Sequence, residues 1–356
     1  MKRLGLLAFI PLAIGLHLAG VSPIVVFAAS ALALVPLASF TEQATESLAE
    51  DLGPTWGGLL SASLGNAPEI IIGFFALRQG LVDVVKSSLI GSIVGNLLFA
   101  LGLSMFVGGL RNGAQHFDRK VAGMNCALLT LAGAGMIIPA VFHHSSRVIT
   151  QEISLQIAGM LFVVYLGSLV FTLAAGRTAI VQATAQPVEE GHESEPRWGR
   201  NRSIGILAAV TIGLAIMSEI LTDALEPASE MMGLTPIFSG VFLLAVVGNV
   251  AQIFNAVSFA RSNRMDLALG VTVGSSIQVA LVVAPVLMFA SLMLGQPMDL
   301  VFSRFEIVAL ALSVLVVRQL IDDGQSNWLE GLMLMAVYFM LGVGFYFLRP
   351  GPIAGN

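Results

Sequence analysis

A pentad that can break a helix and that ends in a carboxylate lies inside an apolar run of the sequence, and it reads Gly65-Asn66-Ala67-Pro68-Glu69. Inserting a charged side chain near the centre of a bilayer costs roughly 2.5 to 3.5 kcal/mol on insertion scales. A carboxylate at this position therefore indicates a functional role for Glu69. The frame of the pentad recurs 183 residues later as Gly248-Asn249-Val250-Ala251-Gln252. Because further residues match at the same offset, the sequence indicates an internal duplication.

The side chains around the two pentads offer oxygen atoms. Gly65, Pro68 and, more mildly, Gly248 are expected to break two helices at mid-membrane, where freed backbone groups need protein, ligand or water as partners. Hard cations take oxygen ligands, so the set suits calcium, sodium or protons rather than copper or zinc. Hydrogen bonding between helices is the alternative role for the amides and hydroxyls. The candidate cation ligands are Glu69, Asn66, Ala67, Asn249, Val250, Gln252, Ser92, Asn96, Ser275 and Gln278, with Ala67 and Val250 acting through backbone carbonyls.

Two acidic pairs also match between the halves. Glu42 and Glu46 correspond to Glu219 and Asp223 at an offset of 177, and a spacing of four places each pair on one helical face. We interpret the pairs as acidic funnels that concentrate cations and pass protons inward, one at each membrane surface. The alternative is that they are solvated helix ends.

Composition places the chain in a membrane. Hydrophobic residues make up 56% of the 356 residues, charged residues 11%, and the mean hydropathy is +0.88. No soluble core could bury so much apolar surface. The single cysteine, Cys126, excludes a disulfide within the chain and a cysteine-rich metal site, and we expect it to be a packing residue.

The apolar segments predict an all-α polytopic membrane protein with eleven transmembrane helices. The first segment also resembles a signal peptide. We expect it to be retained as a helix, because the predicted topology of the following helices is consistent with its presence. The expected helices span about 4–20, 23–52, 54–78, 81–108, 121–141, 152–175, 203–224, 236–261, 265–294, 304–320 and 328–348.

The helices group as one lone helix and two repeats of five. An odd number of spans per repeat forces the second copy to enter the membrane from the opposite side, so the repeats have inverted topology. The predicted divisions are a lone N-terminal helix at 1–22, a first repeat at 23–176, an acidic linker at 177–202 and a second repeat at 203–356.

The distribution of Lys and Arg predicts the orientation. With the N-terminus, the even-numbered loops and the linker on one side, that side carries 12 of the 17 basic residues and the other side 5. By the positive-inside rule, the N-terminus and the linker are cytoplasmic and the C-terminus is outside. The expected location is the plasma (inner) membrane of a prokaryote.

The motifs resemble those of the cation/proton exchanger branch of the calcium/cation antiporters. The resemblance rests on both pentads, on the acidic pair at Glu42 and Glu46, on the acidic linker, and on a run from Met265-Asp266-Leu267-Ala268 to Gly274-Ser275-Ser276-Ile277-Gln278. It covers nearly the whole chain. It implies eleven helices, a mid-membrane site, and exchange of calcium against protons by alternating access.

One departure from the family pattern affects the chemistry. The second pentad of the family usually continues as Gly-Asn-Ala-Ala-Glu-His, but this chain carries Gln252 and Ile253 at the last two positions. A glutamine offers a carbonyl oxygen and no charge. Three outcomes are open: weaker calcium binding aided by Glu46 or Asp223, a change to a monovalent cation such as sodium, or altered proton coupling.

The expected function is therefore secondary active transport of a cation, calcium first, against protons that compete for Glu69. The partners are the lipid bilayer, the cation and protons; neither a cofactor nor nucleic acid is expected. A passive cation channel could use the same oxygens. An enzyme is disfavoured because His143 and His144 lie far from any acidic cluster. The linker acids Glu189 to Glu195 could also sense cytoplasmic calcium.

Overall fold

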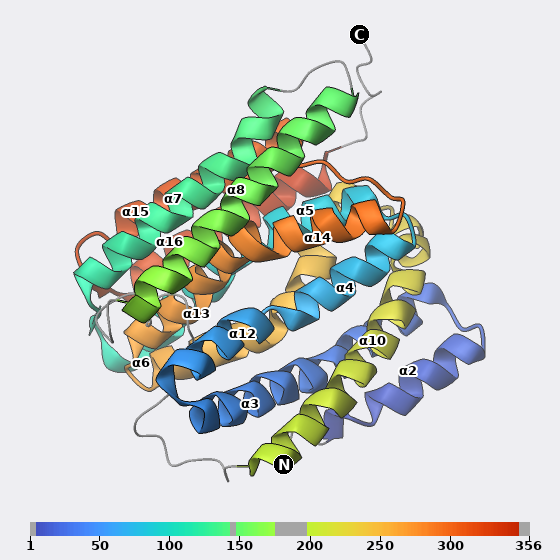
Figure 1. Cartoon of the computed structure of the whole chain (residues 1–356), viewed down its shortest axis with the longest axis horizontal. Helices are drawn as coiled ribbons and strands as arrows, with labels where there is room; N and C mark the ends of the chain where they lie inside the picture. The colour runs from blue at the N-terminus through green and yellow to red at the C-terminus, as the bar shows by residue number, and fades with distance from the viewer. Residues whose placement is uncertain (1–4, 143–146, 175–197, 349–356) are drawn as a thin grey trace.

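The chain is almost entirely helical in a computed structural model that describes residues 5–142, 147–174 and 198–348. Each of the eleven predicted segments falls on helix (Figure 1). In the first half the helices are α2 (Phe9–Leu18), α3 (Pro23–Leu64), α4 (Ala67–Arg78), α5 (Val82–Val94), η1 (Gly95–Ala100), α6 (Leu101–Asn112), α7 (Arg119–Val141) and α8 (Arg147–Ala174). In the second half they are α10 (Arg200–Met231), α11 (Pro236–Phe238), η2 (Ser239–Leu244), α12 (Ala245–Arg261), α13 (Met265–Gln278), η3 (Val279–Val283), α14 (Ala284–Met293), α15 (Arg304–Leu320) and α16 (Trp328–Tyr346).

Eight helices within the described residues are long and apolar enough to cross a membrane. The remaining segments are the ten-residue α2, the 17-residue α15 and the broken helix that contains the first pentad. The prediction of an all-α polytopic membrane protein is therefore confirmed. The division into a lone helix and inverted repeats remains a prediction.

One predicted helix boundary is confirmed and another needs correction. The helix start predicted at Gly53-Pro54 lies at a kink in α3, where Gly53 has a non-helical φ of 79° that a side chain would disfavour. α10 begins at Arg200 and runs to Met231, seven residues past the predicted end at 224. Pro227 lies inside this extension, so the proline does not end the helix.

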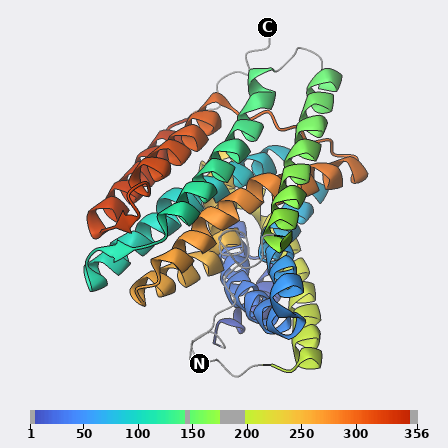
Figure 2. The same cartoon turned by 60° about the vertical axis from the view of Figure 1, so that its left-hand side comes forward.

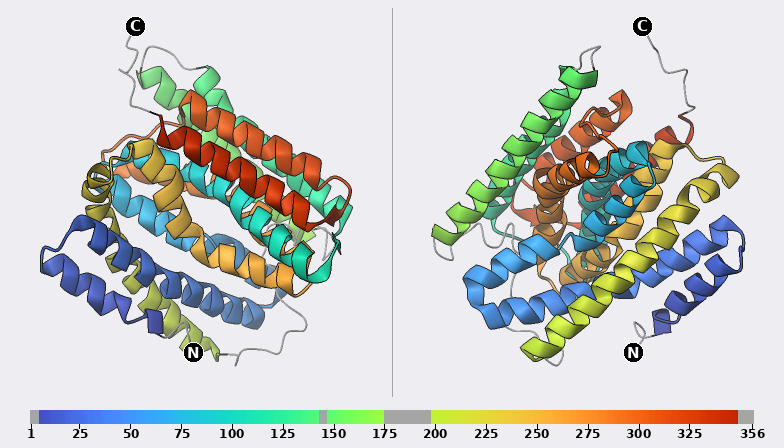
Figure 3. Two further views of the ribbon diagram at one scale, coloured as in Figure 1. Left: turned by 180° about the vertical axis from the view of Figure 1, so that it is seen from behind. Right: turned by 45° about the vertical axis from the view of Figure 1, so that its right-hand side comes forward.

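The helices form two groups around a central set. α2, α3 and α10 pack together through an apolar cluster that includes Ala13, Leu34 and Leu214. Figure 2 shows these three helices apart from α7, α8, α15 and α16. α16 runs beside α6 on the opposite side of the molecule (Figure 3). The central helices α4, α5, α12 and α13 lie between the groups and carry both pentads and their neighbours (Figure 1).

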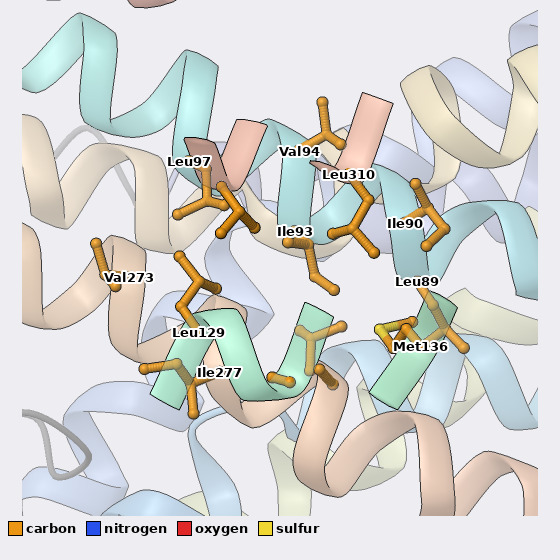
Figure 4. Packing of buried hydrophobic residues seen from close by; sticks show 14 of the residues in the cluster. Leu89, Ile90, Ile93, Val94, Leu97, Leu129, Met136, Val273, Ile277 and Leu310 are labelled. Atoms are coloured by element: carbon orange, nitrogen blue, oxygen red, sulfur yellow. The ribbon is translucent and has the colours of Figure 1, made fainter. Parts of the chain in front are cut away.

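The main core surrounds α5 and α13. Ile90, Ile93 and Leu97 are each at most 1% exposed, and they meet Leu129 of α7 and Ile277 of α13 (Figure 4). A π-helical turn follows α5 at Gly95–Ala100, and another follows α13 at Val279–Val283, close to the 183-residue offset. Such turns are rare overall but are found frequently at functional sites. Here the first contains Asn96, and the second directly follows Gln278.

A short antiparallel pairing joins two loops. β1 (Gln115–His116) follows α6, and β2 (Gln325–Ser326) precedes α16. Arg119 and Asp322 form an exposed ion pair of 3.4 Å beside this pairing. The pairing connects a loop of the first half to a loop of the second half at one end of the bundle.

Candidate functional site

The first pentad interrupts the chain between α3 and α4. Gly65 and Asn66 lie between the two helices, and Asn66 has non-helical backbone angles. Pro68 follows in the first turn of α4, where its missing N–H removes no helical hydrogen bond. Glu69 also lies in this turn, at the positive end of the helix dipole, and it is only 9% exposed. The predicted break is confirmed.

The second pentad does not break its helix, and this expectation was wrong. Residues 248–252 lie within the uninterrupted helix α12, and the irregular turn is η2, which ends four residues before Gly248. Glycine inside a helix costs only about 1 kcal/mol relative to alanine, a cost that packing can outweigh. The Val250 carbonyl is therefore not freed by a break in the helix. The prediction that it is a cation ligand depended on such a break and loses its basis.

The two pentads meet. A Cβ at Gly248 would lie 3.3 Å from Glu69 Cγ, so the absence of a side chain allows α12 to approach α4 closely. Gln252 Nε2 donates to Glu69 Oε1 at 3.0 Å and, more weakly, to Asn66 Oδ1 at 3.4 Å. The structure thus brings together residues that are 183 positions apart in the chain.

Further amides close a buried network around this contact, which we call the amide ring. Asn66 Nδ2 donates to Gln278 Oε1 at 2.5 Å. Asn96 Nδ2 donates to Asn249 Oδ1 at 3.0 Å and to Gln252 Oε1 at 3.1 Å. The amide ring consists of Asn66, Glu69, Asn96, Asn249, Gln252 and Gln278, and each of these side chains is at most 9% exposed.

Ser92 supports the amide ring from α5. Asn249 Nδ2 donates to Ser92 Oγ at 2.9 Å and to the Ala245 carbonyl at 2.7 Å, which fixes the orientation of the Asn249 amide. Ser275 is also buried, but no hydrogen bond joins its side chain to another of the described residues. Ala67 is half-buried at the first helical position of α4. Hydrogen bonds thus connect seven of the ten predicted residues, namely Asn66, Glu69, Ser92, Asn96, Asn249, Gln252 and Gln278.

Two oxygens in the ring have no hydrogen-bond partner within the described part of the chain. They are Glu69 Oε2 and Asn96 Oδ1, and both are buried. Buried polar atoms are nearly always paired, and an unpaired carboxylate oxygen is especially costly. The site therefore offers two oxygens that can coordinate a cation, and one of them, Glu69 Oε2, can also take up a proton.

The acidic pair of α3 is divided between the interior and the surface. Glu42 is buried, accepts a hydrogen bond of 2.5 Å from Asn255 Nδ2, and lies close enough to Glu69 for their charges to interact. Glu46 is exposed. Asn255 was not predicted as a site residue, although its position one helical turn after Gln252 was a usable signal. α12 thus presents two amides in succession, each to one carboxylate.

The acidic pair of α10 is less buried and contacts the end of α4. Glu219 forms an ion pair of 3.4 Å with Arg78, and Asp223 accepts from Gln79 Nε2 at 2.5 Å. The Glu219 side chain is 46% exposed. These contacts link α10 to α4 nine residues beyond Glu69, so this pair lies away from the amide ring.

The described residues contain no group of three or more His, Cys, Asp or Glu side chains that could hold a metal ion. The oxygens of the site come from one central carboxylate, from amides and from the nearby Glu42. The two histidines at 143 and 144 and the linker acids Glu189 to Glu195 lie outside the described residues, so their predicted roles stay predictions.

Comparison with known proteins gives the family. A family model described as sodium/calcium exchanger protein matches residues 22–174 and 202–347. The chain is 43% identical over 356 residues to the Ca²⁺/H⁺ antiporter of Aphanothece halophytica, covering 96% of this chain and 95% of the relative. It is 39% identical to the Ca²⁺/H⁺ antiporter ChaA of Bacillus subtilis strain 168, covering 91% and 92%.

A solved structure supports the same assignment. The structure of native YfkE matches with a TM-score of 0.84 and 35% identity, and the match covers 97% of this chain and all of that one. The resemblance drawn from the motifs is confirmed. With its two matched pentads in contact and both halves covered by the family model, the chain belongs to the sodium/calcium exchanger protein family, in the branch of the calcium/proton exchangers.

Proposed function

We propose that this protein is a secondary active transporter that exchanges calcium against protons by alternating access. The observation that carries the proposal is the carboxylate of Glu69: it is buried between the two pentads, one oxygen accepts from Gln252, and the other has no partner among the described residues. Relatives named Ca²⁺/H⁺ antiporters, at 39–43% identity, support the choice of ions.

Calcium requires six to eight oxygen ligands, and the amide ring offers oxygens from five amides and one carboxylate. In the structure, Gln252 turns its nitrogen toward Glu69 and its oxygen toward Asn96. A cation at Glu69 would repel the Gln252 N–H, so we infer that the Gln252 amide rotates to present its oxygen when calcium binds. Glutamine can do this because its amide carries a donor and an acceptor on one rotatable group.

Charge compensation comes from Glu42 in this proposal. A divalent ion held by one carboxylate would lack full neutralisation in a low-dielectric site. Glu46 and Asp223 were the predicted helpers, but both are exposed, whereas Glu42 is buried and interacts with Glu69. Two carboxylates on α3 and α4 would together neutralise one calcium ion.

Coupling follows from competition. A protonated Glu69 is neutral and loses the charge that attracts the cation, while a bound cation disfavours protonation. The proton and the cation are therefore alternative occupants of one site, and each must leave before the other binds. Movement of the helices that carry the acidic pairs, α3 and α10, would expose the site to the two surfaces in turn.

The proposed location is the plasma (inner) membrane of a prokaryote, with the N-terminus and linker cytoplasmic and the C-terminus outside. The basis is the 12 to 5 division of the basic residues. Neither a cofactor nor a catalysed reaction is part of this proposal.

A monovalent cation such as sodium is the second candidate. It is favoured by one observation: the centre of the amide ring carries only one carboxylate, since Gln252 contributes no charge. One carboxylate neutralises one monovalent ion. The choice between the two candidates depends on whether Glu42 takes part.

The test is cation uptake into vesicles that contain the full chain and carry an imposed pH gradient. The parent should take up calcium as it dissipates the gradient, which a passive channel would not do. Glu69→Gln should abolish both signals, and Glu152→Gln, which alters an exposed carboxylate of α8, should leave both unchanged. Exchange by Glu69→Gln at the rate of the parent would overturn the proposal, and uptake of sodium in place of calcium would favour the second candidate.

A further inference from the structure

A cavity of about 830 Å³ lies beside the amide ring but outside it. Its walls come from α3, from the end of α6, from α12 between Ala251 and Arg261, and from Leu6, which precedes α2. α12 separates it from the site: Gln252 and Asn255 point toward the carboxylates, whereas Phe254 and Val257 line the cavity. The cavity size is typical of a ligand pocket.

Two arginines line one end of this cavity. Arg111 lies in the last turn of α6, and Arg261 is the last residue of α12. The helix ends are held side by side because Asn112 Nδ2 donates to the carbonyls of Ala260 at 3.1 Å and Arg261 at 3.3 Å. Both arginines are exposed, and neither forms an ion pair with another of the described residues.

Among the described residues, the lining includes no carboxylate. Two guanidinium groups with no ion-pair partner among the described residues would repel calcium or sodium at this end, so the cavity does not suit the transported cation. Guanidinium groups instead bind phosphate with paired hydrogen bonds of fixed geometry. The charge at this end is therefore complementary to a phosphate group.

The rest of the lining is largely apolar. Phe254 is 62% exposed, and Val35 and Val257 lie near it. Phe254 precedes Arg261 by seven residues, which is about 10 Å along a helix. The positive charge of the cavity thus lies at the end of the helix bundle. Its apolar wall lies about 10 Å further along α12, toward the middle of the membrane span.

We propose that this cavity binds an anionic phospholipid, with its phosphate between Arg111 and Arg261 and its acyl chains against Val35, Phe254 and Val257. A phospholipid combines the charge and the apolar part that the two ends require, and it is present in the bilayer that the protein spans. The arginines lie on the side that the basic residues predict to be cytoplasmic, and basic pockets between transmembrane helices on that side suit anionic headgroups.

The test is native mass spectrometry of the detergent-solubilised full chain, with phosphatidylglycerol or phosphatidylcholine added. The parent should retain phosphatidylglycerol in preference to phosphatidylcholine. The double variant Arg111→Gln/Arg261→Gln should bind phosphatidylglycerol at least about tenfold more weakly, since it loses two charged hydrogen-bond donors. The matched control Lys120→Gln/Arg318→Gln removes two exposed charges elsewhere on the same predicted side and should bind as the parent does.

A second variant tests the apolar wall without touching the charge. Val257→Trp should fill the part of the cavity assigned to acyl chains and weaken phosphatidylglycerol binding while both arginines remain. Equal retention of the two lipids by the parent, or equal binding by the double variant and its control, would overturn the proposal. So would unchanged binding by Val257→Trp, or displacement of the lipid by inorganic phosphate, which would indicate a site for free phosphate instead.

Discussion

Gln252 Nε2 lies 3.0 Å from Glu69 Oε1, so the amide of the second pentad is hydrogen-bonded to the carboxylate of the first. In the family pattern the position of Gln252 carries a second glutamate. The structure therefore places a neutral donor where the pattern has a second negative charge. The consequences of that difference can be measured one residue at a time.

Restoring the acid should increase calcium affinity. Gln252→Glu adds a second carboxylate beside Glu69, and we expect the KM for calcium to fall about tenfold, or about 1.4 kcal/mol, with a smaller effect on sodium. Uptake of calcium, manganese and sodium into vesicles would measure the change. Gln319→Glu adds the same charge at an exposed position of α15 and serves as the control. An unchanged calcium KM would mean that the existing oxygens already compensate.

Removing the buried acid of α3 should have the opposite effect. Glu42→Gln leaves Glu69 as the only carboxylate near the cation, so we expect the KM for calcium to rise about tenfold while that for sodium changes little. Asn255→Leu should produce a weaker change in the same direction, because Glu42 loses its hydrogen bond from Asn255. The exposed Glu226 of α10 provides the control variant Glu226→Gln. Equal calcium kinetics in Glu42→Gln and the parent would exclude Glu42 from charge compensation.

A methyl group at Gly248 should impair transport without harming the fold. The added Cβ would lie 3.3 Å from Glu69 Cγ, so the Glu69 side chain must shift away from Gln252. Alanine is a better helix former than glycine by about 1 kcal/mol, so thermal stability should stay equal or rise. We expect Gly248→Ala to lower the calcium uptake rate several-fold. Gly123→Ala on α7, where an added Cβ meets nothing within 4 Å, should change neither quantity. Full uptake by Gly248→Ala would show that the close approach is not needed.

Much of the site could be predicted because its residues repeat. The frame shared by residues 65–69 and 248–252 identified Asn66, Glu69, Asn249 and Gln252, and all four lie in one buried network. Helix positions followed from apolar length alone, since a bilayer requires about 20 residues per span.

The remaining features depend on packing that a single sequence does not reveal. Glu42 and Glu46 share one helical face, yet α12 covers Glu42 and leaves Glu46 exposed. Asn255 was missed because its partner Glu42 is 213 residues away and because the position that matches Asn255 in the first half is an isoleucine, Ile72. Gly248 was expected to break its helix, but close packing against Glu69 outweighs the low helix propensity of glycine.

Calcium should stabilise the folded protein in a manner that depends on pH and on Glu69. A ligand that binds only the folded state adds about 2.7 kcal/mol at a concentration of 100 Kd, which raises the thermal midpoint. Protons compete with calcium for Glu69, so we expect the calcium-induced rise in Tm to be largest at alkaline pH and to decline as the pH is lowered. Glu69→Gln cannot be protonated at this position and lacks the charge that holds calcium, so its Tm should not respond to calcium at any pH, whereas Glu152→Gln should respond as the parent does. Differential scanning fluorimetry with and without calcium across a pH series would measure this without any transport step. A rise in Tm that is independent of pH in the parent, or that persists in Glu69→Gln, would show that calcium binds elsewhere and that the buried carboxylate is not its competitor for protons.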